Sequence, residues 1–296
     1  MIKTIGFLQL MRPANIVTSV ADVLAGIAIS GFLFTSGQAS GNFMTILLLC
    51  ISTIGLYGGG VVFNDVFDTA LDRIERPERP IPKGIVTIKE ATALGVGLLL
   101  IGIIAATLVS LLSGLIAMSI AVAALVYNKW SKHHFIAGPL NMGLCRGLNL
   151  LLGISILPAT LSTTWFLAFI PIIYIAAITM VSRGEVHGGS KRVLYFAALL
   201  YGLVIAAILM LSFLQGTVVW TILFLLFFGW MIFSKLFIAV QNPLPQNIGK
   251  AVKAGVIALV LMNAAWAAAF GTLYLAFFIV LLLPLSLWLA KKFAVT

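Results

Sequence analysis

The chain has 296 residues, of which 62% are hydrophobic and only 9% are charged, whereas about 25% are charged in ordinary soluble domains. This composition excludes a water-soluble globular protein and predicts an integral membrane protein, because helices satisfy their own backbone polar groups in lipid. The formal net charge of +10 lies at the ends of apolar segments, so it indicates membrane orientation, and no nucleic acid partner is expected.

Ten apolar segments follow one another along the chain, and each is a candidate membrane-spanning helix. They lie at residues 14–34, 42–63, 90–112, 114–128, 139–157, 163–181, 194–213, 217–239, 251–270 and 272–290. We expect one all-α transmembrane domain over residues 1–296, with the last segment as a tenth helix. No cleavable signal peptide is expected, because the first residues lack the basic, apolar and small-residue order of such signals.

The basic residues indicate how these helices are oriented. With a cytoplasmic N-terminus, seventeen of the eighteen Lys and Arg residues fall on the inner side, and the short outer connections carry none. The positive-inside rule therefore predicts a multi-pass protein of the inner membrane with both termini in the cytoplasm. The exception is Arg146, which lies inside segment 139–157.

Acidic side chains cluster directly after the second segment. Five of the eight acidic residues fall within fourteen positions, beginning with Asp65, Asp68 and Asp72. If the helix continues past the membrane surface, the i, i+3, i+7 spacing places these three carboxylates on one face. Their mutual repulsion favours a divalent cation such as Mg²⁺, which commonly completes its shell with water and substrate phosphates. The alternative is a solvated loop whose acidic and basic residues pair locally.

Three stretches of sequence resemble the UbiA superfamily of intramembrane prenyltransferases. Residues 64–84 read NDxxDxxxD and then RPxRPIPxG, which is similar to the first aspartate-rich motif of that family and the tail that follows it. Arg12-Pro13-Ala14-Asn15 resembles the family's Arg-Pro-x-Asn start. Residues 127–132, with Gly-Pro-Leu at 138–140, are similar to its tyrosine and basic motif after the fourth helix.

The resemblance implies a bundle of nine to ten transmembrane helices around a central cavity that binds a prenyl diphosphate through Mg²⁺. The prenyl group would pass to a hydrophobic acceptor, often an aromatic ring, within the lipid bilayer. By the resemblance, the metal would be held by Asn64, Asp68 and Asp72 with help from Asp65. The further substrate-binding candidates in these motifs are Arg12, Asn15, Arg73, Arg79, Tyr127, Lys129 and Lys132.

The second acidic motif of the family is thin in this chain. Its expected place is the loop at 181–192, where Glu185 is the one remaining carboxylate. Glu185 is a candidate metal contact or general base, and His187 is a second candidate base because histidine titrates near neutral pH. Arg183 and Lys191 are substrate-binding candidates, and the alternative is that they pair with Glu185 in a wet loop. The Glu-Val-His-Gly-Gly sequence is similar to a divergent branch labelled EboC-like.

Arg146 is expected to face the bundle interior, because a charge near the centre of a membrane helix costs about 2.5–3.5 kcal/mol on insertion scales. One interpretation is a cavity cation that binds diphosphate or an acceptor carboxylate. The other is an ion pair with Asp22, the acid inside the first segment.

The leading functional hypothesis is a Mg²⁺-dependent prenyltransferase. The alternative is a catalytically reduced carrier of a lipid or biosynthetic precursor, which the acid-poor second motif favours.

Overall fold

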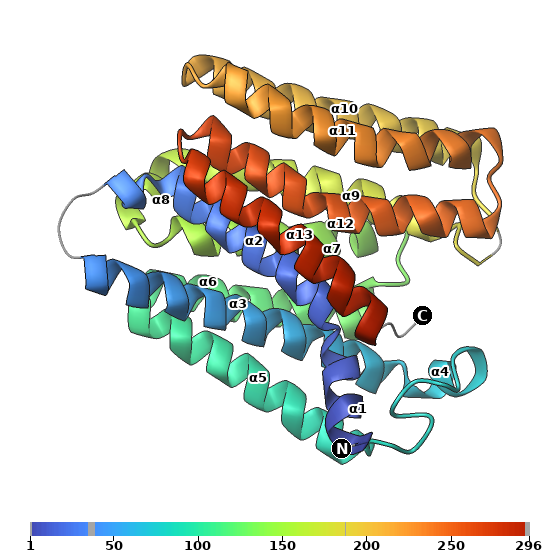
Figure 1. Cartoon of the computed structure of the whole chain (residues 1–296). Coiled ribbons are helices and arrows are strands. Elements are labelled where there is room, and N and C mark those ends of the chain that lie inside the picture. Colours follow the sequence, from blue (N-terminus) through green and yellow to red (C-terminus); the bar gives the residue numbers. More distant parts are fainter. Residues whose placement is uncertain (1, 35–38, 187, 294–296) are drawn as a thin grey trace.

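The computed structural model describes residues 2–34, 39–186 and 188–293, and the regular structure of these residues is helical. Figure 1 labels the α-helices in chain order. Their bounds are α1 Ile2–Met11, α2 Pro13–Ser30, α3 Ala39–Phe67, α4 Thr69–Glu75, α5 Ile88–Val109, α6 Leu111–Val126, α7 Ala137–Ile154, α8 Pro158–Thr164, α9 Phe169–Ser182, α10 Lys191–Leu214, α11 Val218–Gln241, α12 Pro245–Ala269 and α13 Leu273–Phe293. Short turns of other helical types are η1 Phe32–Phe34, η2 Tyr127–Ser131 and η3 Trp165–Ala168.

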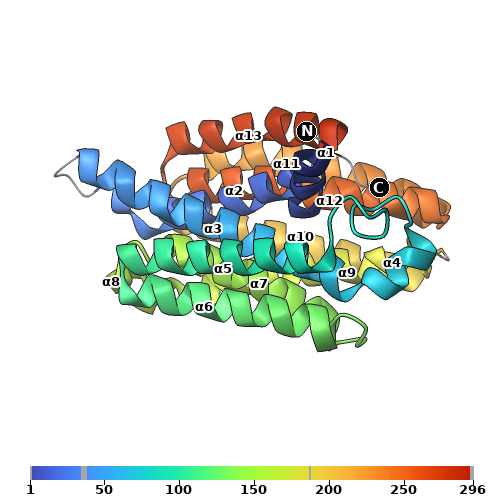
Figure 2. The same ribbon diagram turned by 90° about the horizontal axis from the view of Figure 1, so that it is seen from below.

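The long helices form an elongated bundle. They run roughly along one direction in two perpendicular views (Figures 1 and 2). In Figure 1, α10 and α11 lie at one edge and α5 lies at the other. The short helix α1 instead runs steeply across the bundle axis, near the end at which α2 begins. The segments connect in an up-and-down order, so every second connection lies at the same end of the bundle.

Nine helical stretches in the described part of the chain are long and apolar enough to cross a membrane. The last of them is α13, so the helix expected at 272–290 is present. Helix α7 is not among the nine, because it carries Asn141, Arg146 and Asn149 within eighteen residues. The expectation of an all-helical bundle with nine to ten transmembrane segments is confirmed.

The centre of the bundle is built from helices rich in small residues. Most of α2 and α12 is buried, including a run of alanines towards the end of α12. A Cβ atom at Gly26 of α2 would lie 2.3 Å from the Leu150 carbonyl oxygen, and one at Gly153 of α7 would lie 2.2 Å from that of Val23. Small residues therefore let the backbones of α2 and α7 touch, as in many membrane helix pairs.

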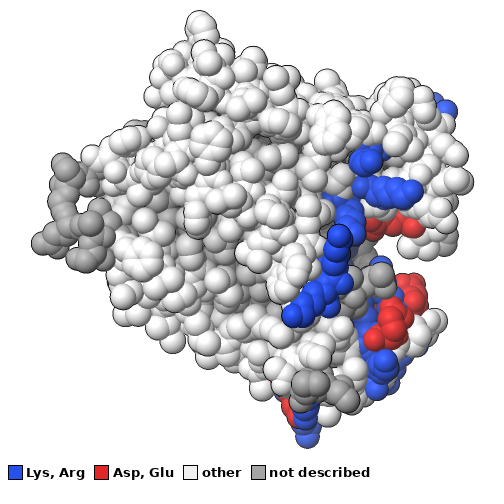
Figure 3. All heavy atoms as spheres, in the orientation of Figure 1, with Lys and Arg blue, Asp and Glu red and all other residues white. Residues whose placement is uncertain are grey.

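The outer helices expose large apolar side chains, as expected for surfaces that face lipid. Examples are Leu108 on α5, Phe213 on α10 and Trp230 on α11. Charged side chains instead gather towards the end at which α2 begins, around a hollow in the surface (Figure 3). The separation of apolar sides from one charged end is the arrangement that the positive-inside pattern predicted.

Candidate active site

A cavity of about 390 Å³ lies between α2, α3, α6, α7, α9 and α12. Polar residues line it at the charged end of the bundle, where Arg12, Asn15, Asn64 and Asn128 meet. The middle is apolar and is lined by Leu56, Ile120, Ile175, Ile178, Val256 and Leu259. At the inner end the wall becomes polar again. Along α3, Thr53 lies eleven positions before Asn64, which corresponds to a depth of roughly 16 Å at 1.5 Å per residue.

Asn64 lines the mouth of the cavity, and Asp68 lies one turn further along the chain, outside the lining residues. Both side chains are held from the side by groups of α6 and its terminal turn. Asn64 donates its Nδ2 hydrogen to Asn128 Oδ1 at 3.1 Å, and Asn128 in turn donates to the Gly60 carbonyl oxygen at 2.8 Å. Asp68 forms an ion pair with Lys132, and both side chains are largely buried. Because η2 continues α6 through a wide turn, with the Lys132 amide donating to the Tyr127 carbonyl oxygen, the lysine reaches back over the mouth.

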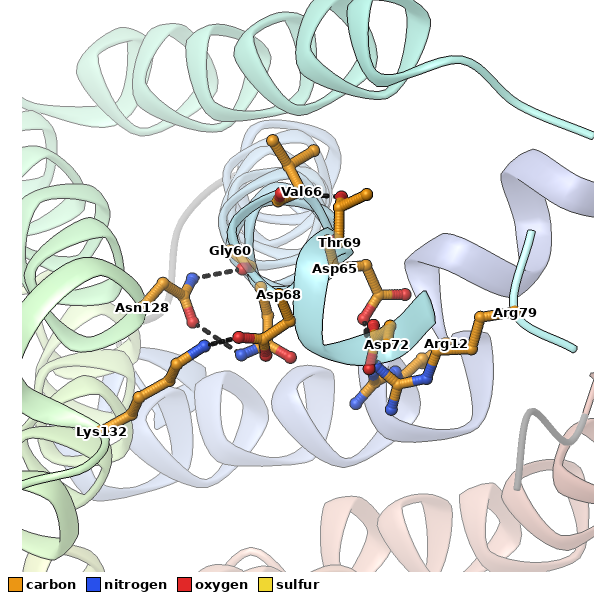
Figure 4. A network of polar contacts seen from close by, with 11 residues as sticks. Arg12, Gly60, Asp65, Val66, Asp68, Thr69, Asp72, Arg79, Asn128 and Lys132 are labelled. Atoms are coloured by element: carbon orange, nitrogen blue, oxygen red, sulfur yellow. Dashed lines mark hydrogen bonds and ion pairs between the residues drawn. The ribbon is translucent and has the colours of Figure 1, made fainter. Parts of the chain in front are cut away.

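Asp65 on α3 and Asp72 on α4 belong to a second cluster, which lies on the side away from Lys132 (Figure 4). Arg12 donates to Asp65 Oδ1 at 2.7 Å, and Arg79 donates to the same oxygen at 3.2 Å. Arg79 also donates to Asp72 Oδ2 at 2.6 Å. The carboxylates and Arg79 are almost fully buried, at 2%, 4% and 4% exposure.

The expectation of three carboxylates on one face is therefore wrong in its geometry. Helix α3 ends at Phe67, and Asp68 has φ −86° and ψ 1°, outside the helical range, before α4 begins at Thr69. Asp68 turns to Lys132, whereas Asp65 and Asp72 share Arg79. Local pairing with arginine, which the sequence left open as an alternative, relieves the repulsion between these two carboxylates.

The donor set at the mouth fits one hard divalent cation. The described residues contain no group of three His, Cys, Asp or Glu side chains placed to hold a metal ion on their own. Mg²⁺ needs fewer, since it is usually bound through one or two carboxylates together with waters and substrate phosphates. Asn64 gives its amide hydrogen to Asn128, which leaves its oxygen as a ligand atom one helical turn from the Asp68 carboxylate.

The inner end of the cavity holds a buried ion pair. Arg146 donates to Asp22 Oδ2 at 2.7 Å, and its guanidinium lies 4.8 Å from the centre of the Tyr57 ring. Asp22 also accepts hydrogen bonds from Asn149 and Asn263. The ion pair of Arg146 with Asp22 is thus present. Arg146 also lines the cavity, and its binding of diphosphate or an acceptor carboxylate stays a prediction.

The loop after α9 supplies fewer of the expected contacts. Glu185 is exposed, and among the described residues no ion pair joins it to Arg183 or Lys191. Arg183 instead donates to the His134 carbonyl oxygen at 2.6 Å. Neighbouring protein atoms still displace part of the water around this carboxylate, which raises the pKa of Glu185 above its usual 4.5, and the positive charge of Arg76 opposes that shift. His187 lies outside the described residues.

The structure brings together some of the remaining sequence candidates and separates others. Arg12, Asn15, Asn64, Tyr127 and Arg146 line the cavity. In contrast, the side chains of Arg73, Lys129, Arg183 and Lys191 are exposed and do not line it.

Tyr57 and Asn128 are among the cavity residues that were not found from the sequence. Tyr57 lies seven positions before Asn64 on α3, so it lies on the same helix face, and the i, i+7 spacing was the available signal. Asn128 lies inside the tyrosine and basic motif, but its buried link between Asn64 and Gly60 depends on how α6 packs against α3.

Comparison with known proteins gives one family. The model described as the UbiA prenyltransferase family matches residues 23–244. A digeranylgeranylglyceryl phosphate synthase from Metallosphaera sedula is 32% identical over 148 residues, which cover 50% of this chain and 50% of that protein. The chain thus matches about half the length of such curated relatives.

Solved structures share the fold. One of them matches with a TM-score of 0.67 at 22% identity, covering 93% of this chain and 100% of that one. It is described as giving structural and mechanistic insights into the biosynthesis of digeranylgeranylglyceryl phosphate synthase in membranes. A UbiA homologue from Archaeoglobus fulgidus bound to DMAPP and Mg²⁺ matches with a TM-score of 0.65 at 15% identity, covering 89% and 98%. At such identities the likeness establishes a common fold.

Proposed function

The chain belongs to the UbiA prenyltransferase family, and from that premise we propose that it transfers a prenyl group from a prenyl diphosphate to a hydrophobic acceptor with the help of Mg²⁺. The observation that carries the proposal is the mouth of the cavity. There Asn64 and Arg12 line the wall, and the ion pair of Asp68 with Lys132 lies one turn from Asn64. Below them the cavity becomes apolar. A prenyl diphosphate matches both parts of the cavity, because its diphosphate is charged and its prenyl tail is apolar.

Binding of the diphosphate would use side chains from several elements. Asn64 and Asp68 would hold the metal, and Arg12 and Lys132 would contact phosphate oxygens. Bound Mg²⁺ supplies charge neutralisation of the diphosphate, which makes it a better leaving group. Arginine and lysine differ in this role, since the planar guanidinium can bind two oxygens while the ammonium acts as a point charge.

Transfer breaks the bond between the prenyl C1 and the diphosphate oxygen, whose electron pair leaves with the diphosphate. The allylic cation that remains must be kept from water until the acceptor attacks it. The apolar middle of the cavity excludes water, and Tyr57 and Tyr127 line the wall with aromatic faces that stabilise positive charge. The new bond forms to an acceptor atom, which then loses a proton.

The acceptor class has two candidates. The family resemblance indicates an aromatic ring, whereas several relatives are named digeranylgeranylglyceryl phosphate synthase, a name that describes a glyceryl phosphate product. Both acceptors are lipophilic and lose a proton on prenylation. Glu185, in the loop that follows α9 and the cavity residue Ser182, is the proposed base for that proton or an additional metal contact.

The charged end of the bundle is proposed to face the cytoplasm of a cell with an inner membrane. The basic residues of the described chain cluster at this end, which the positive-inside rule places in the cytoplasm. Both α1 and the end of α13, with Lys291 and Lys292 in its last turn, would then lie on the cytoplasmic side. Water-soluble short prenyl diphosphates would reach the mouth from there.

The experiment uses the purified full-length protein in lipid nanodiscs. It receives geranyl or geranylgeranyl diphosphate, Mg²⁺ and either 4-hydroxybenzoate or a geranylgeranylglyceryl phosphate. Mass spectrometry measures prenylated products, and a coupled assay measures released pyrophosphate. We expect one acceptor class to give product and stoichiometric pyrophosphate, and EDTA to stop both.

The same assay separates the carrier hypothesis from the enzyme. A carrier moves its ligand across vesicles unchanged and releases no pyrophosphate. Uptake of prenyl diphosphate or acceptor without product or pyrophosphate would contradict the proposed transferase, as would a wild-type protein that binds no diphosphate.

A further inference from the structure

We propose that Asp65, Asp72 and Arg79 are positioning residues that fix the guanidinium of Arg12 at the cavity mouth, and that they are not metal ligands. The inference rests on the proposed function, since it assigns separate tasks to the residues of the acidic motif. Asn64 and Asp68 carry the metal. The other two carboxylates act on the diphosphate through Arg12.

The contacts form a continuous chain from the loop after α4 to the cavity. Asp72 holds Arg79 at 2.6 Å, and Arg79 contacts Asp65 at 3.2 Å. Asp65 then holds Arg12 at 2.7 Å. Of these four side chains, Arg12 is the one that lines the cavity, and it is also the most exposed, at 29% against 3–6% for the others. The cluster therefore presents a single cation to the ligand.

Charge and burial explain why the cluster is fixed. Two carboxylates and two guanidiniums balance, so there is no excess negative charge to attract a metal ion. The Arg79 Nε is buried without a hydrogen-bond partner in the described chain. Burying such an unpaired donor costs free energy, so other contacts of Arg79 must offset this cost. The ion pairs of Arg79 to two carboxylates are those contacts. Removing either partner would leave an uncompensated buried charge.

The backbone of Arg12 is itself unusual. Its φ of 49° and ψ of 67° place it in the left-handed region, and it is the one non-glycine residue with positive φ in the described chain. A residue before proline is normally extended, so this conformation persists because the surroundings hold it. Asp65 supplies the side-chain contact that does so, and the turn directs the arginine from the end of α1 to the mouth.

The break between α3 and α4 separates the two tasks. Asn64 and Asp65 lie on α3, Asp68 lies at the break, and Asp72 lies on α4, so the carboxylates of Asp68 and Asp72 turn to different partners. Figure 4 shows Asp68 directed to Lys132 on one side, while Asp65 and Asp72 meet Arg12 and Arg79 on the other. One motif thus offers a metal face and an arginine-holding face.

The test measures two equilibria with purified full-length protein. One is the affinity for geranyl diphosphate at fixed Mn²⁺, and the other is the half-saturating Mn²⁺ concentration at saturating geranyl diphosphate. We expect Asp65→Asn and Arg79→Met to weaken geranyl diphosphate binding about tenfold, the size of one lost charged hydrogen bond. The Mn²⁺ requirement stays within about twofold, whereas Asp68→Asn raises it by more than about tenfold.

Coupling to Arg12 distinguishes positioning from general structural damage. Once Asp65→Asn has released the arginine, adding Arg12→Ala causes little further loss of affinity, so the two effects do not multiply. Arg79→Lys covers the case in which Arg79→Met fails to fold, because it keeps the charge but loses the planar guanidinium. We expect this variant to bind geranyl diphosphate more weakly with an unchanged Mn²⁺ requirement. Lys83→Met removes an exposed cation of the same segment and leaves both equilibria unchanged.

Three results would overturn the inference. Asp65→Asn could raise the Mn²⁺ requirement as much as Asp68→Asn, which would make Asp65 a metal ligand. The losses from Asp65→Asn and Arg12→Ala could multiply, which would make them independent. Wild-type protein that binds no geranyl diphosphate would overturn the proposed function, and this inference with it. The first two results instead leave wild-type binding intact and overturn the inference alone, so the two failures are distinguishable.

Discussion

The mouth and the inner end of the cavity both contain buried pairs of opposite charge, but they are built differently. At the inner end, Asp22 accepts three hydrogen bonds, from Arg146 and Asn149 on α7 and from Asn263 on α12. At the mouth, Asp68 has the flexible Lys132 as its ion-pair partner, and Asn64 retains a free oxygen.

The difference indicates where chemistry is possible. A hydrogen-bonded ion pair deep in the membrane holds helices together, since taking away either partner leaves a charge in lipid-like surroundings. A pair between one carboxylate and the ammonium of a long, unbranched side chain, beside a further oxygen ligand, can open to admit a metal and a diphosphate. We therefore expect mutations at the mouth to affect activity and mutations at the inner end to affect stability.

The largest expected effect is that of Asp68→Ala. Loss of the carboxylate beside the departing diphosphate removes metal binding, and we expect pyrophosphate release to fall by about 10³-fold or more while the protein stays folded. Glu75→Ala changes an exposed acid of the neighbouring helix α4 and should leave the rate within about twofold. Equal losses in both variants would remove the distinction between Asp68 and an ordinary surface acid.

At the inner end, Arg146→Met should lower the free energy of unfolding by about 3–5 kcal/mol, because it leaves Asp22 buried and unpaired. The double variant Asp22→Leu with Arg146→Met should recover most of that loss, since an apolar pair of similar size replaces the charges. Denaturant titration in detergent micelles measures both. The comparison fails if Arg146→Met destabilises no more than Lys132→Met does.

Lys132→Met should have an intermediate effect that appears mainly in substrate binding. The lysine contacts Asp68 in the free protein and is proposed to turn to a phosphate oxygen, so KM for the prenyl diphosphate should rise about tenfold. Steady-state kinetics at saturating acceptor measures this change. Arg192→Met removes an exposed cation at the same end of the bundle and serves as the matched control. An unchanged KM in Lys132→Met would exclude the lysine from the diphosphate site.

Glu185→Gln should have the smallest effect, a decrease in kcat of about two- to tenfold. Because the loss of part of its surrounding water raises the pKa of Glu185 above 4.5, the carboxylate is protonated, and inactive as a base, as pH falls through this raised value. The wild-type rate should thus fall on the acid side of the pH profile, and Glu185→Gln should lose that limb. Glu78→Gln, at an exposed acid, should keep it.

Most of the fold could be predicted from the sequence, because apolar segments of membrane length carry a strong and local signal. Helix α7 shows the limit of that signal. Its segment is less apolar than the others because Arg146 and Asn149 are directed to partners on α2, which lies far away in the sequence. Hydropathy alone cannot distinguish such a cavity helix from a weak span.

The site was predictable in its members but not in its pairing. The spacing of Asn64, Asp65, Asp68 and Asp72 located the motif, yet the break at Asp68 and the return of Arg79 from the following loop divide its acids into two clusters. Such division depends on tertiary contacts at seven and fourteen residues' separation. Tyr57 was within reach of a periodicity argument, whereas the links made by Asn128 and Asn263 were not.

The most direct test of the account is the position of a metal ion in a crystal structure of this protein with Mn²⁺ and a non-hydrolysable thiolo analogue of geranyl diphosphate. The anomalous signal of manganese should appear at the mouth of the cavity between Asn64 and Asp68, with the diphosphate beside Arg12 and the geranyl chain in the apolar middle. Manganese and analogue found away from this mouth would contradict the account.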